Sequence, residues 1–141
     1  QMGVEDQGWV AWFIIAAVSG RPITIYGDGK QVRDVLYIED LLDVYDAGVE
    51  QIDIAVGEVY NVGGGPDRTL SIWKEFGPLL QELTGVTVGV SHEDWRPGDQ
   101  LVYVSDIQKA EEELGWRPNV AVEDGIRRLH DWVVANQDLF V

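Results

Sequence analysis

Apolar residues along the chain recur at two spacings, one typical of amphipathic helices and one typical of short strands. The helical spacing predicts helices over residues 7–19, from 39 to about 51, from 71, from 105 or 106, and from about 122 to 136. Runs of β-branched and aromatic residues predict extended segments at 23–26, 32–38, 58–62 and 86–90. Because strands alternate with helices, the pattern predicts an α/β fold.

Glycine and proline mark where these elements end. Gly27-Asp28-Gly29 predicts a turn after the first strand. Pro78 lies inside a helical pattern, where its missing backbone donor predicts a break or kink. Gly115 suits a left-handed residue at a helix end, with the residue after it packing back onto that helix.

The composition is that of one compact domain over residues 1–141. The 141 residues include 45% hydrophobic positions and no cysteine, which allows a core and excludes disulfides and thiolate chemistry. The longest apolar run, Trp9 to Val18, is shorter than the about 20 residues that a membrane span needs. The lack of cysteine fits a cytoplasmic protein, which we expect, and the N-terminus shows no basic, apolar leader.

The net charge of −15 restricts the choice of partners. Such an acidic chain repels nucleic acid and anionic membranes, so neither is expected as a partner. It also repels a phosphorylated ligand unless an arginine receives that ligand locally. Arg33 lies between Val32 and Asp34-Val35-Leu36, in a segment expected to be partly buried, and Arg96 lies in the loop DWRPGDQ. Each predicts either a structural ion pair, with Asp34 or Asp99, or a contact to a diphosphate.

Three other candidate sites are not supported by the sequence. Tyr26 and Lys30 match the Tyr-x-x-x-Lys spacing of a catalytic pair, but that pair needs a helix, which the glycines between them oppose. The glycine run at 63–65 lacks the spacing of a dinucleotide fingerprint. The His-Glu-Asp run at 92–94 has no further converging ligand, so no metal site is expected. The sequence therefore offers no catalytic residue and no cofactor-binding residue.

Three blocks of the sequence occur in a specific order. RPITIYGDGKQVRDVLYIEDLLDVY is followed by EVYNVGGG and then by WRPGDQLVYVSDIQKAEEELGWRPNVAVEDGI. These blocks resemble the C-terminal, substrate-binding half of extended short-chain dehydrogenases, the NAD-dependent epimerase/dehydratase family that acts on nucleotide sugars. The opening MGVEDQGWVAWF, with RPGDQLVYVSD, looks most like the CDP-paratose (CDP-tyvelose) 2-epimerase branch. The resemblance covers nearly the whole chain.

The resemblance implies that the ligand is a nucleotide-diphosphate sugar. By position, Tyr26 would contact the base, and Arg33 and Arg96 would contact the diphosphate. Asn61 would contact a phosphate or a nearby backbone group, and Asp99 the ribose region. The sugar or the base would lie near two further residues, Gln7 and Trp9.

The resemblance also implies a missing partner. In this family an N-terminal Rossmann half holds NAD and carries the Tyr-x-x-x-Lys pair, and residues 58–62 would add a strand to its sheet. Because the glycine-rich fingerprint is absent here, the chain is expected to be a fragment of a larger two-part enzyme, to bind no NAD alone and to be inactive without the Rossmann half. The alternative is a stand-alone, non-catalytic α/β domain that acts through self-association, as a homodimer, or through partner binding, with its tryptophans and its aromatic N-terminal helix as the interface.

Overall fold

The structure is a computed structural model that describes residues 8–140. These residues form two compact units, which we describe separately. The first unit is formed by residues 8–31, 71–101 and 123–140, and the second by Val32–Leu70 and Val102–Val122. Both units contain helices and a parallel strand pair, which confirms the predicted α/β class.

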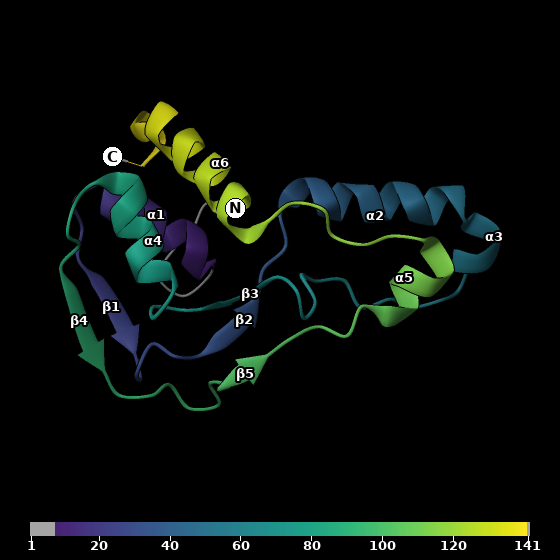
Figure 1. The fold of residues 1–141 in the computed structure, drawn as a ribbon, viewed down its shortest axis with the longest axis horizontal. Helices are drawn as coiled ribbons and strands as arrows, with labels where there is room; N and C mark the ends of the chain where they lie inside the picture. The colour runs from purple at the N-terminus through teal and green to yellow at the C-terminus, as the bar shows by residue number, and fades with distance from the viewer. Residues whose placement is uncertain (1–7, 141) are drawn as a thin grey trace. The chain divides into compact units, whose positions relative to one another are not determined.

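The first unit is built around one pair of parallel strands (Figure 1). Its elements are α1 (Trp9–Val18), β1 (Ile23–Tyr26), α4 (Phe76–Thr84), β4 (Val90–Glu93), most of α6 (Val122–Ala135) and a short 3-10 helix (Gln137–Leu139). Ile23 pairs with Val90, and Tyr26 pairs with Glu93. The sequence predicts the strand that pairs with β1 at residues 86–90. The observed strand β4 begins only at Val90, where its pairing with β1 begins.

The core of the first unit is rich in aromatic side chains. Phe76 is fully buried, and its ring lies 5.3 Å from Trp9 and 6.1 Å from Phe13 between centroids. Phe13 also meets the Trp73 ring edge-on at 5.8 Å. Most of α1 is buried, which leaves this helix little free surface for the interface that the alternative reading places there.

Helix α4 begins later than the sequence predicts. Ser71 and Glu75 precede it and bond reciprocally: the Ser71 amide and hydroxyl each donate to Glu75 Oε2 at 2.7 Å, and the Glu75 amide donates to Ser71 Oγ at 2.9 Å. Because the helix starts at Phe76, Pro78 lies in its first turn, where a missing donor breaks no helical hydrogen bond. The expected break within the helix is therefore replaced by a helix start.

The second unit holds a three-stranded sheet in the order β3-β2-β5. Its elements are β2 (Val32–Asp34), α2 (Ile38–Glu50), α3 (Ile52–Ala55), β3 (Thr69–Ser71), β5 (Val102–Tyr103) and α5 (Gln108–Leu114). Strands β2 and β5 are parallel, and Val32 lies opposite Val102. Within the residues described for this unit, 58–62 belong to no strand, so the predicted strand there is wrong for this chain by itself.

A small core joins α2, α5 and the segment after α5. Trp116 is buried and its indole Nε1 donates to the Asp40 carbonyl at 2.9 Å. The buried Asp40 carboxylate accepts the backbone amides of Asn119 and Val120. Gly115 ends α5 with φ 65°, which confirms its predicted left-handed role.

Residues 58–62 are held against α5 by side chains instead of by a sheet. The Tyr60 hydroxyl donates to Glu113 at 2.8 Å, and Lys109 pairs with Glu58. Burial and the neighbouring Glu113 carboxylate raise the pKa of Tyr60 to about 12. An extended segment forms a strand only when a neighbouring segment bonds to its backbone. The sequence pattern of residues 58–62 does not predict whether such a neighbour is present.

Helix α2 carries an uncovered apolar stripe, which we define as Ile38, Leu42, Tyr45 and Val49. These four side chains recur at helical spacing and are all exposed, and Val49 is the most exposed of them at 71%. The buried side of the helix is formed by Asp40 and Val44. Among the described residues, no helix is both long and apolar enough to cross a bilayer.

The Ser71–Glu75 pair predicts a pH-dependent contribution to stability. Hydrogen bonds from Ser71 lower the pKa of Glu75, so its stabilising effect is present above the ordinary carboxyl pKa and is lost as pH falls through the lowered value. Glu75→Gln should therefore reduce the free energy of unfolding at pH 7, and the difference from wild type should shrink below about pH 4. Chemical denaturation measures both. Glu82→Gln, on the exposed surface of α4, is the control and should show no such trend.

Candidate functional site

The first unit brings Tyr26 and Arg96 into direct contact. Tyr26 is the last residue of β1, and the guanidinium carbon of Arg96 lies 3.8 Å from the centroid of its ring. This is a cation–π contact, in which the face of the ring attracts the positive charge. The arrangement holds a cation beside an aromatic ring at the carboxyl end of a strand.

Asp99 belongs to the same cluster. Its amide donates to the Arg96 carbonyl at 3.1 Å, which closes a turn that contains Gly98 at φ 80°. Its carboxylate accepts the side-chain amide of Gln31 at 3.1 Å, and that amide also donates to the Tyr26 carbonyl at 2.6 Å. Tyr26, Arg96 and Asp99 therefore form one site, which we call the Tyr26 cluster.

Trp95 is held beside this cluster and was missed by sequence reasoning. A Cβ at Gly27 would lie 2.7 Å from the Trp95 ring, so only glycine allows the indole to pack there. Gly27 also has φ 81° and donates its amide to the Glu93 carbonyl at 2.9 Å. Trp95 remains 42% exposed. The feature of the sequence that could have indicated Trp95 as a site residue is its place next to Arg96 in a loop.

The other residues predicted near the sugar or base have different outcomes. Trp9 is half-buried and meets Phe13 and Phe76 edge-on in the core of the first unit. Gln7 lies outside the described residues. The Tyr26 cluster is thus the part of the predicted set that the first unit assembles.

The second unit contains Arg33 and Asn61. Arg33 is half-buried in β2, and its Nη1 donates to the carbonyl of Val32 at 2.9 Å. Asp34, one expected partner of this arginine, accepts the amide of Gly65 at 3.0 Å. Asn61 is exposed. Both residues stay predictions as phosphate contacts.

The glycine run at 63–65 is explained by close packing within the second unit. A Cβ at Gly63 would lie 2.2 Å from Ser105 Oγ, and one at Gly64 would lie 2.2 Å from the Val35 carbonyl. A Cβ at Gly65 would lie 2.8 Å from Ile107. These close contacts give a packing reason for glycine at all three positions.

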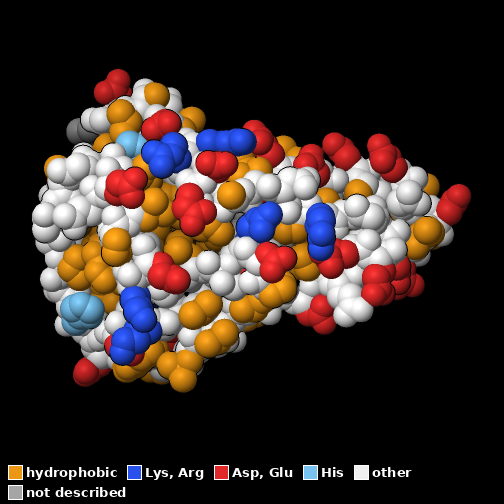
Figure 2. All heavy atoms as spheres, in the orientation of Figure 1, with side chains coloured by type: hydrophobic (Ala, Val, Ile, Leu, Met, Phe, Trp, Pro, Cys, Tyr) orange, Lys and Arg blue, Asp and Glu red, His pale blue; other side chains and the backbone are white. Residues whose placement is uncertain are grey.

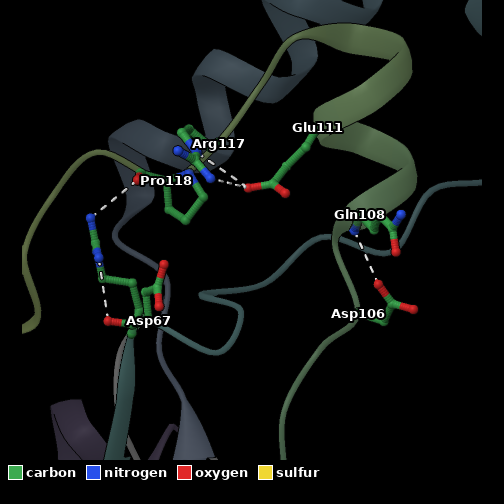
Figure 3. A network of polar contacts seen from close by, with 7 residues as sticks. Asp67, Asp106, Gln108, Glu111, Arg117 and Pro118 are labelled. Atoms are coloured by element: carbon green, nitrogen blue, oxygen red, sulfur yellow. Dashed lines mark hydrogen bonds and ion pairs between the residues drawn. The ribbon is translucent and has the colours of Figure 1, made fainter.

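The second unit also contains a pocket of about 680 Å³, and Figure 3 shows polar contacts among the residues that line it. Arg68 lines it and donates to the Pro118 carbonyl at 3.3 Å and to the Val120 carbonyl at 3.0 Å. Arg117 pairs with Glu111 at 3.0 Å, as Figure 3 shows. Both cations in the pocket therefore have partners within the chain.

Metal ligation finds no support in the part of the chain that the structure describes. No group of three or more His, Cys, Asp or Glu side chains there is arranged to hold an ion. His92 lies near the Gly27 carbonyl, with 3.2 Å from its Nδ1 to that oxygen, and His130 lies near Asp131. The two histidines thus have separate local partners.

The fold and the order of motifs define a class of protein. The α/β arrangement matches the C-terminal portion of extended short-chain dehydrogenases of the NAD-dependent epimerase/dehydratase type. The chain belongs to the GDP-mannose 4,6 dehydratase family, which it matches over residues 9–129. The resemblance inferred from the sequence blocks is therefore confirmed.

Curated relatives agree with this assignment. The chain is 36% identical over 137 residues to a CDP-paratose 2-epimerase of Salmonella typhi. The aligned region covers 94% of this chain and 40% of that protein. It is 38% identical over 137 residues to a dTDP-glucose 4,6-dehydratase of Neisseria gonorrhoeae, covering 88% of this chain and 38% of the relative. The chain thus spans about 40% of the length of the curated relatives that it matches.

Solved structures show the same partial match. The UDP-glucuronic acid 4-epimerase of Bacillus cereus, in complex with UDP-glucuronic acid and NAD, is 28% identical with a TM-score of 0.82, covering 94% of this chain and 40% of that one. The UDP-glucose 4-epimerase of Thermotoga maritima, solved with UDP-glucose, is 30% identical with a TM-score of 0.77, covering 94% and 40%. Both support the predicted fold of the C-terminal portion.

The packing of Trp95 on Gly27 predicts a specific cost of adding a methyl group. Gly27→Ala and Gly85→Ala both replace a glycine of positive φ, at 81° and 68°, so each adds backbone strain of about 1–2 kcal/mol. At Gly85 no atom lies within 4 Å of the added methyl, whereas at Gly27 the Trp95 ring does. Gly27→Ala should therefore lose at least about 1 kcal/mol more in denaturant unfolding. Equal losses would show that Trp95 is not held at this glycine.

Proposed function

We propose that this chain is the nucleotide-sugar-binding part of an NAD-dependent sugar epimerase or dehydratase. The observation that carries the proposal is the Tyr26 cluster, in which the guanidinium of Arg96 lies 3.8 Å from the Tyr26 ring centroid. Arginine recognises phosphate oxygens through a planar set of donors. Its position over an aromatic ring limits the orientations of that set, so the anion-binding group is partly ordered before a ligand arrives.

The chemistry of the cluster suits a nucleoside diphosphate. Arg96 supplies positive charge in a chain whose net charge is −15, so it acts as a local anion receptor. Tyr26 offers an aromatic surface for a base. The carboxylate of Asp99 accepts the side-chain amide of Gln31, and a carboxylate is the kind of acceptor that binds ribose hydroxyls.

The remaining predicted contacts rest on the family resemblance. We assign Arg33 to the diphosphate, Asn61 to a phosphate or nearby backbone group, and Gln7 and Trp9 to the vicinity of the sugar or base. NAD would be held by the part of the family fold that this chain does not span, where it would supply transient oxidation and reduction of the sugar. We therefore assign no catalytic residue to residues 1–141, and expect no turnover by this chain alone.

The first test is the affinity for nucleoside diphosphates. Calorimetric titration of the chain with CDP and with UDP should give saturable heat. Arg96→Ala should weaken binding about tenfold or more, because a hydrogen bond to a charged group contributes about 1.5–3 kcal/mol. Arg117→Ala is the control, because Arg117 is a surface arginine paired with Glu111 in the second unit.

Two outcomes would count against the proposal. The absence of saturable heat at millimolar CDP and UDP would contradict a binding site formed by this chain. Equal losses in Arg96→Ala and Arg117→Ala would show that the affinity depends on net charge and not on the Tyr26 cluster.

A second candidate function is self-association without catalysis. The apolar stripe of α2 favours it, because Tyr45 is 63% and Val49 is 71% exposed. Figure 2 shows hydrophobic side chains among acidic ones over the α2 and α3 region. Uncovered apolar surface of this kind marks an interface. In this candidate function the stripe is covered by a second copy of the chain, whereas in the first it is covered by the rest of the family fold.

Light scattering distinguishes the two candidates. Self-association through the stripe predicts a concentration-dependent dimer that Val49→Lys disrupts, because a charge is placed in an apolar interface. Asp43→Lys, at an exposed position of the same helix away from the stripe, is the control and should leave the dimer intact. A monomer at all concentrations would exclude this second function, and a dimer that survives Arg33→Ala and Arg96→Ala would support it.

A further inference from the structure

Gln31 is a buried polar side chain at the centre of the first unit's candidate site. It is 2% exposed and follows the turn at the end of β1. Its backbone carbonyl accepts the amide of Ile72 at 2.8 Å, so the backbone at this position is fixed independently of the side chain. The side chain is therefore not needed to hold the backbone at this position.

The hydrogen bonds of the Gln31 side chain define its orientation. Nε2 lies 2.6 Å from the Tyr26 carbonyl oxygen and 3.1 Å from Asp99 Oδ2. Both partners are acceptors, so the nitrogen and not the oxygen of the amide must face them. The consequence is that Oε1 is buried and makes no hydrogen bond to any residue that the structure describes.

A buried acceptor without a partner opposes folding, because it loses its bonds to water and gains none in return. Packing alone does not require this group, because methionine has nearly the same length and shape without the polar atoms. A glutamine at this position thus retains an unfavourable oxygen while its nitrogen bridges two parts of the Tyr26 cluster. Such a compromise is typical of a residue kept for function.

We propose that Gln31 is a positioning residue for the nucleoside-diphosphate site, an inference that rests on the proposed function. Its amide ties the carboxylate of Asp99 to the end of β1. Because the Asp99 amide bonds to the Arg96 carbonyl at 3.1 Å, fixing Asp99 also fixes the turn that carries Arg96. Gln31 thereby holds Arg96 over the Tyr26 ring before the ligand binds.

The geometry favours this bridge over a purely structural role. Gln31 and Asp99 are 68 positions apart in the sequence, and the side-chain bond between them links the strand end to the turn at 96–99. The backbone bond from Ile72 holds Gln31 whether or not its side chain is polar. Loss of the amide should therefore release the turn more than it disturbs the core.

The test compares Gln31→Met with Gln81→Met, which makes the same chemical change at an exposed position of α4. Calorimetry with UDP and CDP, well below the unfolding midpoint, should show about tenfold weaker binding for Gln31→Met only. NMR supplies a second readout, because protons above an aromatic ring are shifted upfield. The side-chain protons of Arg96 should show this shift in the wild type and lose it in Gln31→Met, a change that a merely structural role would not cause.

Gln31→Asn is a second variant that tests the same role if Gln31→Met does not fold. It keeps the amide but is one methylene too short to bridge both acceptors, so it should also weaken binding and reduce the Arg96 shift. If wild type binds and either folded variant binds equally well with the shift retained, the positioning role is wrong while the proposed function stands. If wild type binds neither nucleotide, the proposed function fails and the inference fails with it. Failure of both variants to fold would assign Gln31 to stability and would also overturn the inference.

Discussion

The parallel pairing of β1 with β4 is the constraint on which the candidate site depends. The register places Tyr26 opposite Glu93, so the chain leaving β4 reaches Trp95 and Arg96 beside the end of β1. The amide of Gly27 continues the pairing by donating to Glu93 at 2.9 Å. Shifting the register by one residue would turn the side chains of β4 to the opposite face and remove Arg96 from the Tyr26 ring. The contact between an arginine and an aromatic ring therefore follows from backbone pairing.

The cations of this acidic chain have distinct surroundings. In the second unit, Arg68 donates to backbone carbonyls and Arg117 pairs with Glu111. Those contacts hold the segment after α5 in place and are structural. In the first unit, Arg96 lies over an aromatic ring in a turn braced by Gln31 and Asp99. The site is assigned to Arg96 because this arginine contacts Tyr26, the residue that the family resemblance places at the base.

Elements defined by local pattern were predictable from the sequence. The helices near α1, α2, α5 and α6 and the strand at Ile23–Tyr26 follow from spacing and from glycine ends, and their observed bounds differ by only a few residues. Elements that depend on a partner were not predictable. Residues 58–62 have strand-like composition but no strand partner in their unit, and β4 begins where β1 pairs with it. The apolar stripe of α2 has the right spacing for a core face, yet it is exposed.

Candidate residues show the same division between local pattern and distant contact. Arg96 and Tyr26 were identified from motif resemblance, and the structure adds their mutual contact. Gln31 was missed because nothing in its local sequence indicates burial, which arises from partners such as Asp99, 68 positions away. Trp95 was missed for a similar reason, since its position depends on the missing Cβ of Gly27.

We propose that the Tyr26 cluster binds a nucleoside diphosphate. The most direct measurement is an NMR titration of the isotope-labelled chain with UDP, followed residue by residue. Binding at the Tyr26 cluster should give saturable shifts concentrated at Tyr26, Gln31, Trp95, Arg96 and Asp99, with little change in the exposed face of α4. Shifts concentrated instead at Arg68 and Arg117 in the pocket of the second unit, or no saturable shift at all, would contradict it.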